Sequence, residues 1–575
     1  MKKAIKIGML CPLLIILIAV TSCTKLDEKV YSSVTPENYF KTQNDVYSFF
    51  GLSNYRIQDY LRASSWRAQE IGTDELTLPK RGADWYDGGK FVRFQHHAWN
   101  EQDDELKDRW LIAVSGITQI VDIKGQLSGM DLTKFNISDD VKKGMLAQCD
   151  CRMAYLYLRG LDFFGDFVIY DPKAITLPKR SKAEKVFNLI ETTLTTALPN
   201  LPKKTSGQDQ DGTVTQGGAA AMLIQLYLNA ERYTNKPMYD KCKEIAQKLI
   251  NGDYGGYSLD PNWNGRWNKD NYKSNDMLWC LRSRKDNGWR YGWVTGSNHY
   301  NVMPYFNNSL TGDGNGWCLS PSSDPFGKAY TSKMGRPYAK MNDKDLRKQP
   351  YQYWPTTDNF TGMLLVGLLR NQVTGVTATG VKEISGQPLI MYDQICRYSI
   401  LQGNTHADTA ALVSSVEEGG DENSGIRCVK IFTPDDNHID EYYSTAAPIY
   451  TLSEAYFALA ECKYRSGDKG GAADLINAVR KRNFAGGVDP DPVTSANLDD
   501  YRFLDEYMIE FLWEGRRRPD LIRWGKYHTE SWWDHVPSAL DQTPDPNNYG
   551  KPMSFRYPVP QAALAGNPKL NEAPE

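Results

Sequence analysis

The chain has 575 residues, and its 67 lysines and arginines against 70 aspartates and glutamates give a formal net charge of −3. This balance offers no strongly basic surface, so the sequence excludes nucleic acid as a partner. The length is sufficient for one large core or two modules. Eight of the ten cysteines lie beyond Cys23, and they form neither a CxxC pair nor another zinc-ligand spacing. We therefore expect mostly buried free thiols, no bound metal and no cofactor.

The N-terminus has the pattern of an export signal. Three lysines precede an apolar run from Ile7 to Val20, which is too short to span a bilayer and fits a signal peptide. The following Val20-Thr21-Ser22-Cys23 resembles a bacterial lipobox, with cleavage and acylation at Cys23. An ordinary signal peptide with a chance cysteine is the alternative. We predict a lipoprotein signal peptide over 1–22 and a lipidated tether over 23–42, attached to the membrane by its acyl chains.

A long loop interrupts the first helical part of the chain. Helical periodicity predicts helices over Glu105–Leu127 and Lys142–Phe164, and another that opens at Ser181. Between Glu70 and Trp99, four glycines and a proline break that pattern. Loops on a rigid scaffold commonly carry binding residues. This loop combines stacking faces with hydrogen-bonding groups in Asp74, Arg81, Asp84, Trp85 and Tyr86.

Two stretches have the pattern of paired helices. The first covers Thr213–Arg232 and Met238–Ile250, and the second begins at Ser453 and runs to Arg482. Alanines and glycines occur where the two helices of each pair would touch, and Gly467 marks the turn of the second pair. Small residues at such positions are typical of tetratricopeptide repeats. Two unrelated amphipathic hairpins are the alternative.

The middle of the chain, from 251 to 440, lacks helical periodicity. Glycine, proline, asparagine and aspartate are frequent, with short β-prone stretches at 278–281, 389–392 and 428–432. Tryptophans in this polar setting present flat apolar faces beside hydrogen-bonding groups, which suits sugar rings, although they also serve to build small local cores. Seven of the fifteen tryptophans fall here: Trp263, Trp267, Trp279, Trp289, Trp293, Trp317 and Trp354.

One fragment of the middle region has part of a calcium-binding pattern. Asp260-x-Asn262-x-Asn264-Gly265 matches the head of such a loop, but Asn271 stands where a bidentate glutamate is required. We therefore favour a polar turn over a calcium site. The sequence also lacks a Walker-type loop and the HExxH and GxSxG patterns.

The stretch from Tyr501 to Gly525 is predicted to be a helix–turn–helix hairpin, with the first helix ending at Gly515 and Pro519 near the start of the second. Two interpretations of its charges are open. The carboxylates could form a catalytic pair, as in glycosidases, or the arginines could neutralise them and lock the hairpin, which we favour. The charged residues are Glu506, Glu510, Glu514, Arg516, Arg517, Arg518, Asp520 and Arg523.

The run Glu514-Gly515-x-Arg517-x-x-Asp520-Leu521-x-Arg523-Trp524-Gly525 resembles the C-terminal signature of the SusD/RagB family. Stretches that begin at Thr73, Cys149, Arg180, Thr213, Gly425 and Pro448 also resemble blocks of that family. Pro519 and Thr451 depart from the family pattern. The resemblance implies an outer-membrane nutrient-binding lipoprotein built on tetratricopeptide-like helix pairs. It also implies a partner, a TonB-dependent SusC-like transporter that the family covers as a lid.

We therefore predict a mainly α fold, in which tetratricopeptide-like helix pairs form a scaffold for a large irregular loop-rich subdomain. The expected divisions are an N-terminal helical region over 43–250 with a binding loop at 70–99, a variable ligand-binding region over 251–440, and a C-terminal helical region over 441–575.

The expected function is non-enzymatic capture of a glycan at the cell surface, exposed on the outer membrane, and its delivery to the transporter. The alternatives are a surface glycoside hydrolase lipoprotein and a binder of peptide cargo. We place the ligand site where the 70–99 loop meets the middle region. The predicted contacts are Asp74, Arg81, Trp85 and Tyr86, faced across the groove by Trp289, Tyr291, Trp293 and Trp317.

Overall fold

The structure is a computed structural model, and it describes residues 39–62, 66–283, 285, 297–301, 303–309, 314–322, 333–354, 359–403, 419–532, 544–545, 551–552 and 556–575. The chain divides into two units, Met1–Ser48 and Phe49–Glu575. The predicted signal peptide and Cys23 lie outside the described residues, as do Trp289, Tyr291 and Trp293. Within the described residues, no helix combines the length and apolar character needed to cross a membrane.

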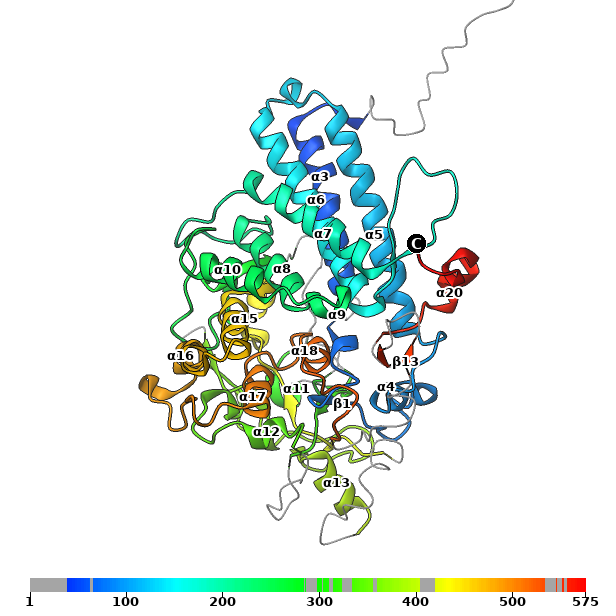
Figure 1. The fold of residues 1–575 in the computed structure, drawn as a ribbon. Coiled ribbons are helices and arrows are strands. Elements are labelled where there is room, and N and C mark those ends of the chain that lie inside the picture. The colour runs from blue at the N-terminus through cyan, green and yellow to red at the C-terminus, as the bar shows by residue number, and fades with distance from the viewer. Residues whose placement is uncertain are drawn as a thin grey trace, which may run out of the picture. The chain divides into compact units, whose positions relative to one another are not determined.

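Long helices begin the second unit. Most of helix α3 (Gln43–Arg62) belongs to this unit, and α5 (Asp104–Gly129) packs against α6 (Asp139–Phe164), which packs against α7 (Ala183–Ala197) (Figure 1). The helices predicted over Glu105–Leu127, over Lys142–Phe164 and from Ser181 are therefore present. Ser138 starts α6, because its hydroxyl accepts a hydrogen bond from the main-chain N–H of Val141.

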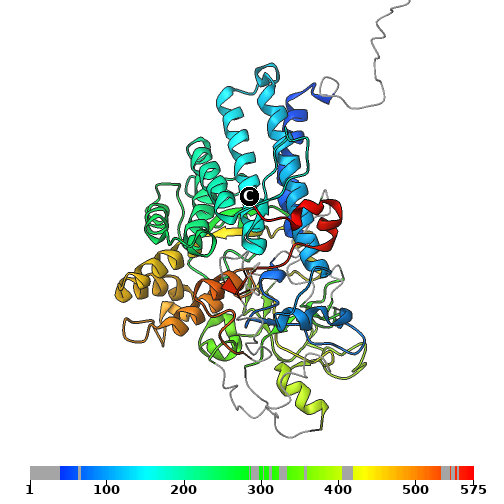
Figure 2. The same cartoon turned by 45° about the vertical axis from the view of Figure 1, so that its right-hand side comes forward.

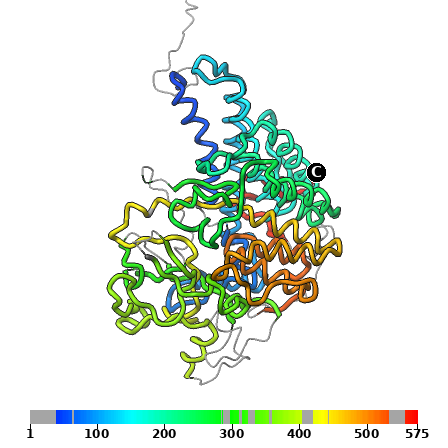
Figure 3. Tube along the Cα trace, turned by 90° about the vertical axis from the view of Figure 1, so that its left-hand side faces the viewer, coloured from blue at the N-terminus to red at the C-terminus, as the bar shows by residue number. Residues whose placement is uncertain are grey.

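The two predicted helix pairs form one continuous stack. Helix α8 (Gln216–Leu228) packs on α10 (Tyr239–Ile250), α10 packs on α15 (Leu452–Arg465), and α15 packs on α16 (Lys469–Arg480) (Figures 2 and 3). The whole middle region is thus inserted between two helices that lie side by side. Alanines such as Ala455, Ala458 and Ala472 are buried in this stack, as the tetratricopeptide-like prediction requires.

A strand pair connects the inserted region to the stack. Strand β4 (Met277–Leu281) pairs antiparallel with β12 (Ala447–Thr451), with Leu281 opposite Ala447. Thr451 at the end of β12 is also the N-cap of α15, in a capping box with Glu454. Thr451, named above as a departure from the pattern that the sequence resembles, thus has a structural role as the cap of α15.

The remaining sheets of the described residues each have two antiparallel strands. Two of them link distant parts of the chain: β1 (Leu76–Thr77) pairs with β5 (Cys318–Leu319), and β8 (Leu364–Leu365) pairs with β11 (Arg427–Cys428). The others are β2 (Phe167–Val168) with β3 (Arg180–Ser181), β6 (Gln352–Trp354) with β7 (Asn359–Thr361), β9 (Gly367–Leu368) with β10 (Ile390–Met391), and β13 (Pro544–Asp545) with β14 (Lys551–Pro552).

The C-terminal hairpin differs in one respect from its prediction. Helix α17 (Asp500–Glu510) ends before Phe511, so the first helix stops five residues earlier than Gly515. The turn needs two left-handed residues, Trp513 with φ 61° and Gly515 with φ 75°. A Cβ at Gly515 would lie 3.2 Å from Trp66, so glycine also serves the packing. The second helix, α18 (Arg517–Arg523), follows directly.

The shorter helices lie mainly in the loops. The 70–99 loop contains α4 (Lys90–Gln95), a turn of helix that the sequence did not predict. The others are α9 (Ala230–Thr234), α11 (Met303–Phe306), α12 (Pro337–Lys340), α13 (Gln394–Leu401) and α20 (Gln561–Gly566). The eight cysteines beyond Cys23 are all described, and all are buried without a disulfide bond, in agreement with the expectation of mostly buried thiols.

Candidate functional site

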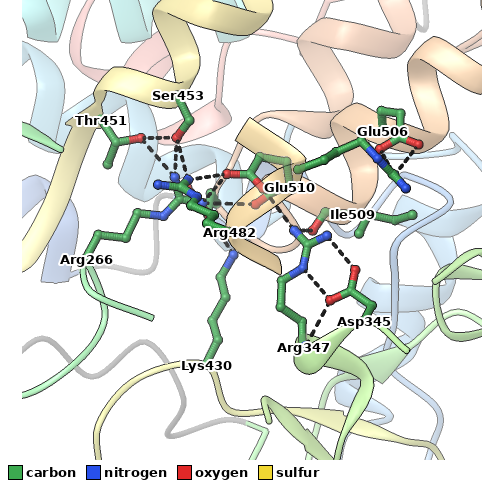
Figure 4. A network of polar contacts seen from close by, with 12 residues as sticks. Arg266, Asp345, Arg347, Lys430, Thr451, Ser453, Arg482, Glu506, Ile509 and Glu510 are labelled. Atoms are coloured by element: carbon green, nitrogen blue, oxygen red, sulfur yellow. Dashed lines mark hydrogen bonds and ion pairs between the residues drawn. The ribbon is translucent and has the colours of Figure 1, made fainter. Parts of the chain in front are cut away.

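The carboxylates of the C-terminal hairpin are tightly paired with cations. The Glu510 carboxylate lies 2.7 Å from Arg482, 2.9 Å from Arg347 and 3.0 Å from Arg266 (Figure 4). Burial alone raises the pKa of Glu510, but these three guanidinium groups lower it to about 2. Glu510 is therefore ionised at any physiological pH, which is the opposite of what a catalytic acid requires.

The other two glutamates of the first helix and its turn, Glu506 and Glu514, are also paired with cations. Glu506 accepts hydrogen bonds from Arg480 at 2.5 and 2.6 Å. Glu514 lies 2.5 Å from Lys430 and 3.5 Å from Arg266. The hairpin is thus an ion-paired core that joins α17 to the middle region, which agrees with the structural interpretation of its charges.

Asp74 joins the binding loop to the same hairpin. Its carboxylate receives two hydrogen bonds from Arg517, at 2.6 and 2.7 Å, and one from the main-chain N–H of Gly335 at 2.8 Å. Its side chain is fully buried. The prediction that Asp74 contacts ligand is therefore not kept, because both oxygens are used and neither faces solvent.

Arg81 anchors the tip of the loop from inside. Its guanidinium group is fully buried and donates to the main-chain oxygens of Gly316 at 2.9 Å, Asp421 at 2.8 Å and Ser424 at 2.6 Å. Its main chain forms a bridge with Asp84, through hydrogen bonds of 3.0 and 2.8 Å. Arg81 thus positions the loop. Because its side chain is fully buried, it is not placed to contact a ligand directly, contrary to the prediction.

Trp85 is wedged between the loop and the middle region. Its indole N–H donates to the Gly314 carbonyl, and its ring centroid lies 5.7 Å from those of both Phe91 and Trp317. Its φ of 65° is unusual for a bulky residue. Trp317 is only 3% exposed, so it supports Trp85 from beneath and does not form the opposite wall of a groove. Trp85 itself is half-buried.

Tyr86 is the aromatic residue that the loop presents to solvent, with 47% of its surface exposed. The Lys80 ammonium group lies 5.6 Å from its ring centroid. Two residues earlier in the loop, Asp84 forms an ion pair with Lys382, and that ammonium group lies 3.7 Å from the ring centroid of Tyr300. We call the set of Lys80, Asp84, Trp85, Tyr86, Tyr300 and Lys382 the loop surface.

Sequence reasoning did not single out Tyr300 or Lys382. Lys382 is 298 positions from its partner Asp84, and no local pattern links the two segments. Glu422 contributes to this arrangement, because its carboxylate accepts the main-chain N–H of Val381 at 2.8 Å and pairs with His299. Glu422 therefore links the segment that carries Tyr300 to the segment that carries Lys382.

The calcium-like fragment serves structural purposes. Asn264 donates a hydrogen bond to the Phe360 carbonyl, and Asp260 accepts one from Ser274 at 2.7 Å. Asn271 bridges Arg266 and Ala446 through its side-chain amide. In the part of the chain that the structure describes, no three His, Cys, Asp or Glu side chains are grouped as metal ligands. Residues 263–267 form turns, and the side chains of Asp260, Asn264 and Asn271 make hydrogen bonds within the protein.

The protein belongs to the class of helical-repeat proteins that carry a large loop-rich insertion between two stacked helices. Comparison with known sequences gives the family. The sequence model of the SusD family matches residues 262–575, so the chain belongs to the SusD family. It is 24% identical over 497 residues to the starch-binding protein SusD of Bacteroides thetaiotaomicron, covering 83% of this chain and 82% of that protein. It is also 31% identical to the SusD-like protein P25 of Formosa agariphila, over 129 residues that make up 22% of this chain and 23% of P25.

Solved structures share the fold. Bacteroides fragilis NanU superposes with a TM-score of 0.62 at 16% identity, covering 94% of this chain and 98% of NanU. Surface glycan-binding protein A of Bacteroides thetaiotaomicron, solved with laminarihexaose, superposes with a TM-score of 0.60 at 14% identity, covering 93% and 100% of the two chains. These likenesses establish the mainly α architecture with tetratricopeptide-like helix pairs.

Proposed function

We propose that the protein is a non-catalytic, cell-surface glycan-binding lipoprotein that captures an oligosaccharide at the loop surface. The observation that carries this proposal is Tyr86, an exposed aromatic ring on a loop that is anchored from beneath by Arg81 and Trp85. The name of the relative SusD, a starch-binding protein, and the laminarihexaose complex of a structural neighbour support glycan as the ligand class.

The loop surface has the chemistry that a sugar needs. The C–H face of a pyranose ring packs on an aromatic ring, and the hydroxyl groups around it exchange hydrogen bonds with polar neighbours. Tyr86 supplies the ring, and the ion pair of Lys382 with Asp84, two residues before Tyr86 in the loop, supplies a donor and an acceptor. Because the main chain of the loop is fixed by buried contacts, little conformational entropy is lost on binding.

The assignment of individual residues changes accordingly. We propose Tyr86 as the main stacking residue and the exposed part of Trp85 as a secondary contact. Trp289, Tyr291 and Trp293, which lie outside the described residues, remain proposed contacts. Asp74, Arg81 and Trp317 are proposed to hold the loop in its binding conformation.

Captured glycan would pass to a TonB-dependent SusC-like transporter in the outer membrane. The proposal includes a lipid anchor at Cys23, which would keep the protein beside that transporter. Co-purification from solubilised outer membranes tests the partnership, because a stable pair should bring a TonB-dependent barrel with the full chain. Recovery of the protein without such a barrel would argue against delivery while leaving glycan binding open.

Affinity electrophoresis and calorimetry with a panel of glycans test the binding itself. Tyr86→Ala should weaken binding of the recognised glycan at least tenfold with an unchanged melting temperature. Tyr55→Ala is the matched control, since Tyr55 is a similarly exposed tyrosine (43%) on α3. Unchanged affinity in Tyr86→Ala would remove the loop surface from the proposal. Sustained release of shorter sugars by the wild type would favour the hydrolase alternative.

A further inference from the structure

The variable region contains a cavity that none of the predicted site residues lines. Its volume is about 260 Å³, against about 50 Å³ for a cavity between the stacked helices. Four segments of the chain meet around it: α11, β6, the turn at 372–373 and the segment 433–438. The lining residues are Phe306, Tyr353, Gln372, Val373, Thr433, Asp435, Asn437 and His438.

Hydrogen bonds between these segments fix the walls. The Asp436 carboxylate accepts from the main-chain N–H and the hydroxyl group of Ser309, at 2.8 and 2.9 Å. The Asp436 N–H donates to the Asn307 carbonyl at 2.8 Å. Next to the turn at 372–373, the Asn371 amide donates to the Met303 carbonyl at 3.0 Å. The cavity is therefore a built feature, because the segment 433–438 and the turn at 372–373 are both tied to α11 or to the residues that follow it.

Three polar side chains of the lining use only part of their hydrogen-bonding capacity. The Gln372 Oε1 accepts the Tyr353 N–H at 2.7 Å, and the Nδ1 of His438 lies 2.6 Å from Asp435. Asn437 donates to the same Asp435 carboxylate at 3.4 Å. These bonds involve the Oε1 of Gln372, the Nδ1 of His438 and the side-chain amide N–H of Asn437, and they leave out the Nε2 of Gln372, the Nε2 of His438 and the Oδ1 of Asn437. Each of these side chains is thus oriented by a hydrogen bond at one polar atom, and its second polar atom is the one that a ligand would contact.

The apolar part of the lining consists mainly of aromatic rings. Phe306 and Tyr353 are almost fully buried, at 3% and 7% exposure, and the His438 ring stands edge-on to Tyr353 at 6.0 Å and 78°. Val373, the other apolar residue of the lining, is 49% exposed. Aromatic walls with a few oriented donors and acceptors are the composition of a small-molecule site, and sugar rings match both parts of it.

The charge of the lining narrows the ligand class. Asp435 is the carboxylate of the lining, and neither lysine nor arginine contributes to it in the part of the chain that the structure describes. An acidic sugar would bring a second negative charge without a cation to pair with it. The volume lies just below the roughly 300–1,000 Å³ of typical drug-sized ligand sites, which suits a single ring.

We propose that this cavity binds one neutral pyranose ring, as a second carbohydrate site that shares no residue with the loop surface. Gln372, Asn437 and His438 hydrogen-bond to the ring hydroxyl groups, and Phe306 and Tyr353 pack against its C–H groups. The site extends the proposed glycan-binding function, and it is tested independently of the loop surface because separate residues form each.

The probes are methyl glycosides of neutral hexoses and pentoses, each compared with its uronate. Binding to the full chain in detergent is followed by ligand-observed NMR at sugar concentrations on the order of 10 mM, since a single ring binds weakly. At least one neutral glycoside should bind, with its uronate at least tenfold weaker. Absence of binding by every neutral glycoside, or preference for a uronate, would overturn the proposal.

Two variants locate the site. Gln372→Glu keeps the oxygen that accepts the Tyr353 N–H but removes the free donor, and it should weaken binding at least tenfold. Val373→Trp adds bulk to the lining at an exposed position, and it should have the same effect without altering the melting temperature. Gln402→Glu, an exposed position with the same chemical change, is the matched control.

A Tyr86→Ala comparison separates the two sites. Glycoside binding that survives Tyr86→Ala and is lost in Val373→Trp supports the cavity. Binding that is lost in Tyr86→Ala and survives in both cavity variants would overturn the second site and leave the loop surface as the proposed one.

Discussion

The ion-paired hairpin gives a prediction whose size follows from the structure. In Glu510→Gln, one carboxylate is removed from a buried group that contains Arg266, Arg347 and Arg482, so positive charge is left without compensation. Breaking a buried pair of this kind typically costs about 3–5 kcal/mol. The pKa of Glu510 gives a second estimate. Its fall from 4.5 to about 2 corresponds to roughly 3 kcal/mol of folding free energy.

The assay is urea unfolding of the wild type and of Glu510→Gln, followed by circular dichroism across a range of pH. Because the pKa of Glu510 is lowered by folding, its stabilisation is complete above pH 4.5 and is lost as the pH falls toward 2. The difference in unfolding free energy between the two proteins should therefore be about 3 kcal/mol at neutral pH and shrink steadily in acid.

The control is Glu244→Gln, which removes an exposed carboxylate paired with Lys248 at i,i+4 on α10. No measurable change in stability is expected there, because solvent screens the pair. A difference for Glu510→Gln that stays constant down to pH 2 would refute the electrostatic reasoning and assign the loss to altered packing. A difference below that of the control would show that the three arginines do not depend on this carboxylate.

Three further predictions concern the loop, the buried acids and the anchor. Trp85→Ala should lower both glycan affinity and the melting temperature, because its indole holds Gly314 and packs on Trp317; lost affinity at full stability would instead make it a purely ligand-contacting residue. Burial raises the pKa of Glu70 to about 8, so its contribution to stability is complete below 4.5 and is lost as the pH rises to about 8. In the wild type the urea midpoint should therefore fall as the pH rises over that range, and in Glu70→Gln it should depend less on pH. An equal fall in both proteins would contradict this. Metabolic labelling with a clickable fatty acid should mark the wild type and not Cys23→Ala, and equal labelling of the two would exclude lipidation at Cys23.

Part of the loop region was predictable and part was not. The glycines and proline between Glu70 and Trp99 predicted an irregular segment, and the structure has one, apart from α4. The positions of the individual side chains in this segment were not predictable from the sequence. Asp74 and Arg81 have the polarity of ligand contacts, but Asp74 lies against Arg517, 443 positions away. Exposure separates adjacent aromatic residues, since Tyr86 faces solvent while Trp85 is wedged. A local pattern carries no information about partners that arrive from hundreds of residues away.

The sequence by itself determined the helices, the two repeat-like pairs and the family. Helical periodicity and small residues are local properties, because a helix and its turn are set by neighbours within a few positions. The tertiary structure alone decided that α10 and α15 pack together across a 200-residue insertion, and that Tyr300 and Lys382 join the loop surface. It also decided that Phe306, Gln372 and His438 line one cavity. Such contacts depend on which buried surfaces fit together over the whole chain, and therefore appear only when the chain is folded.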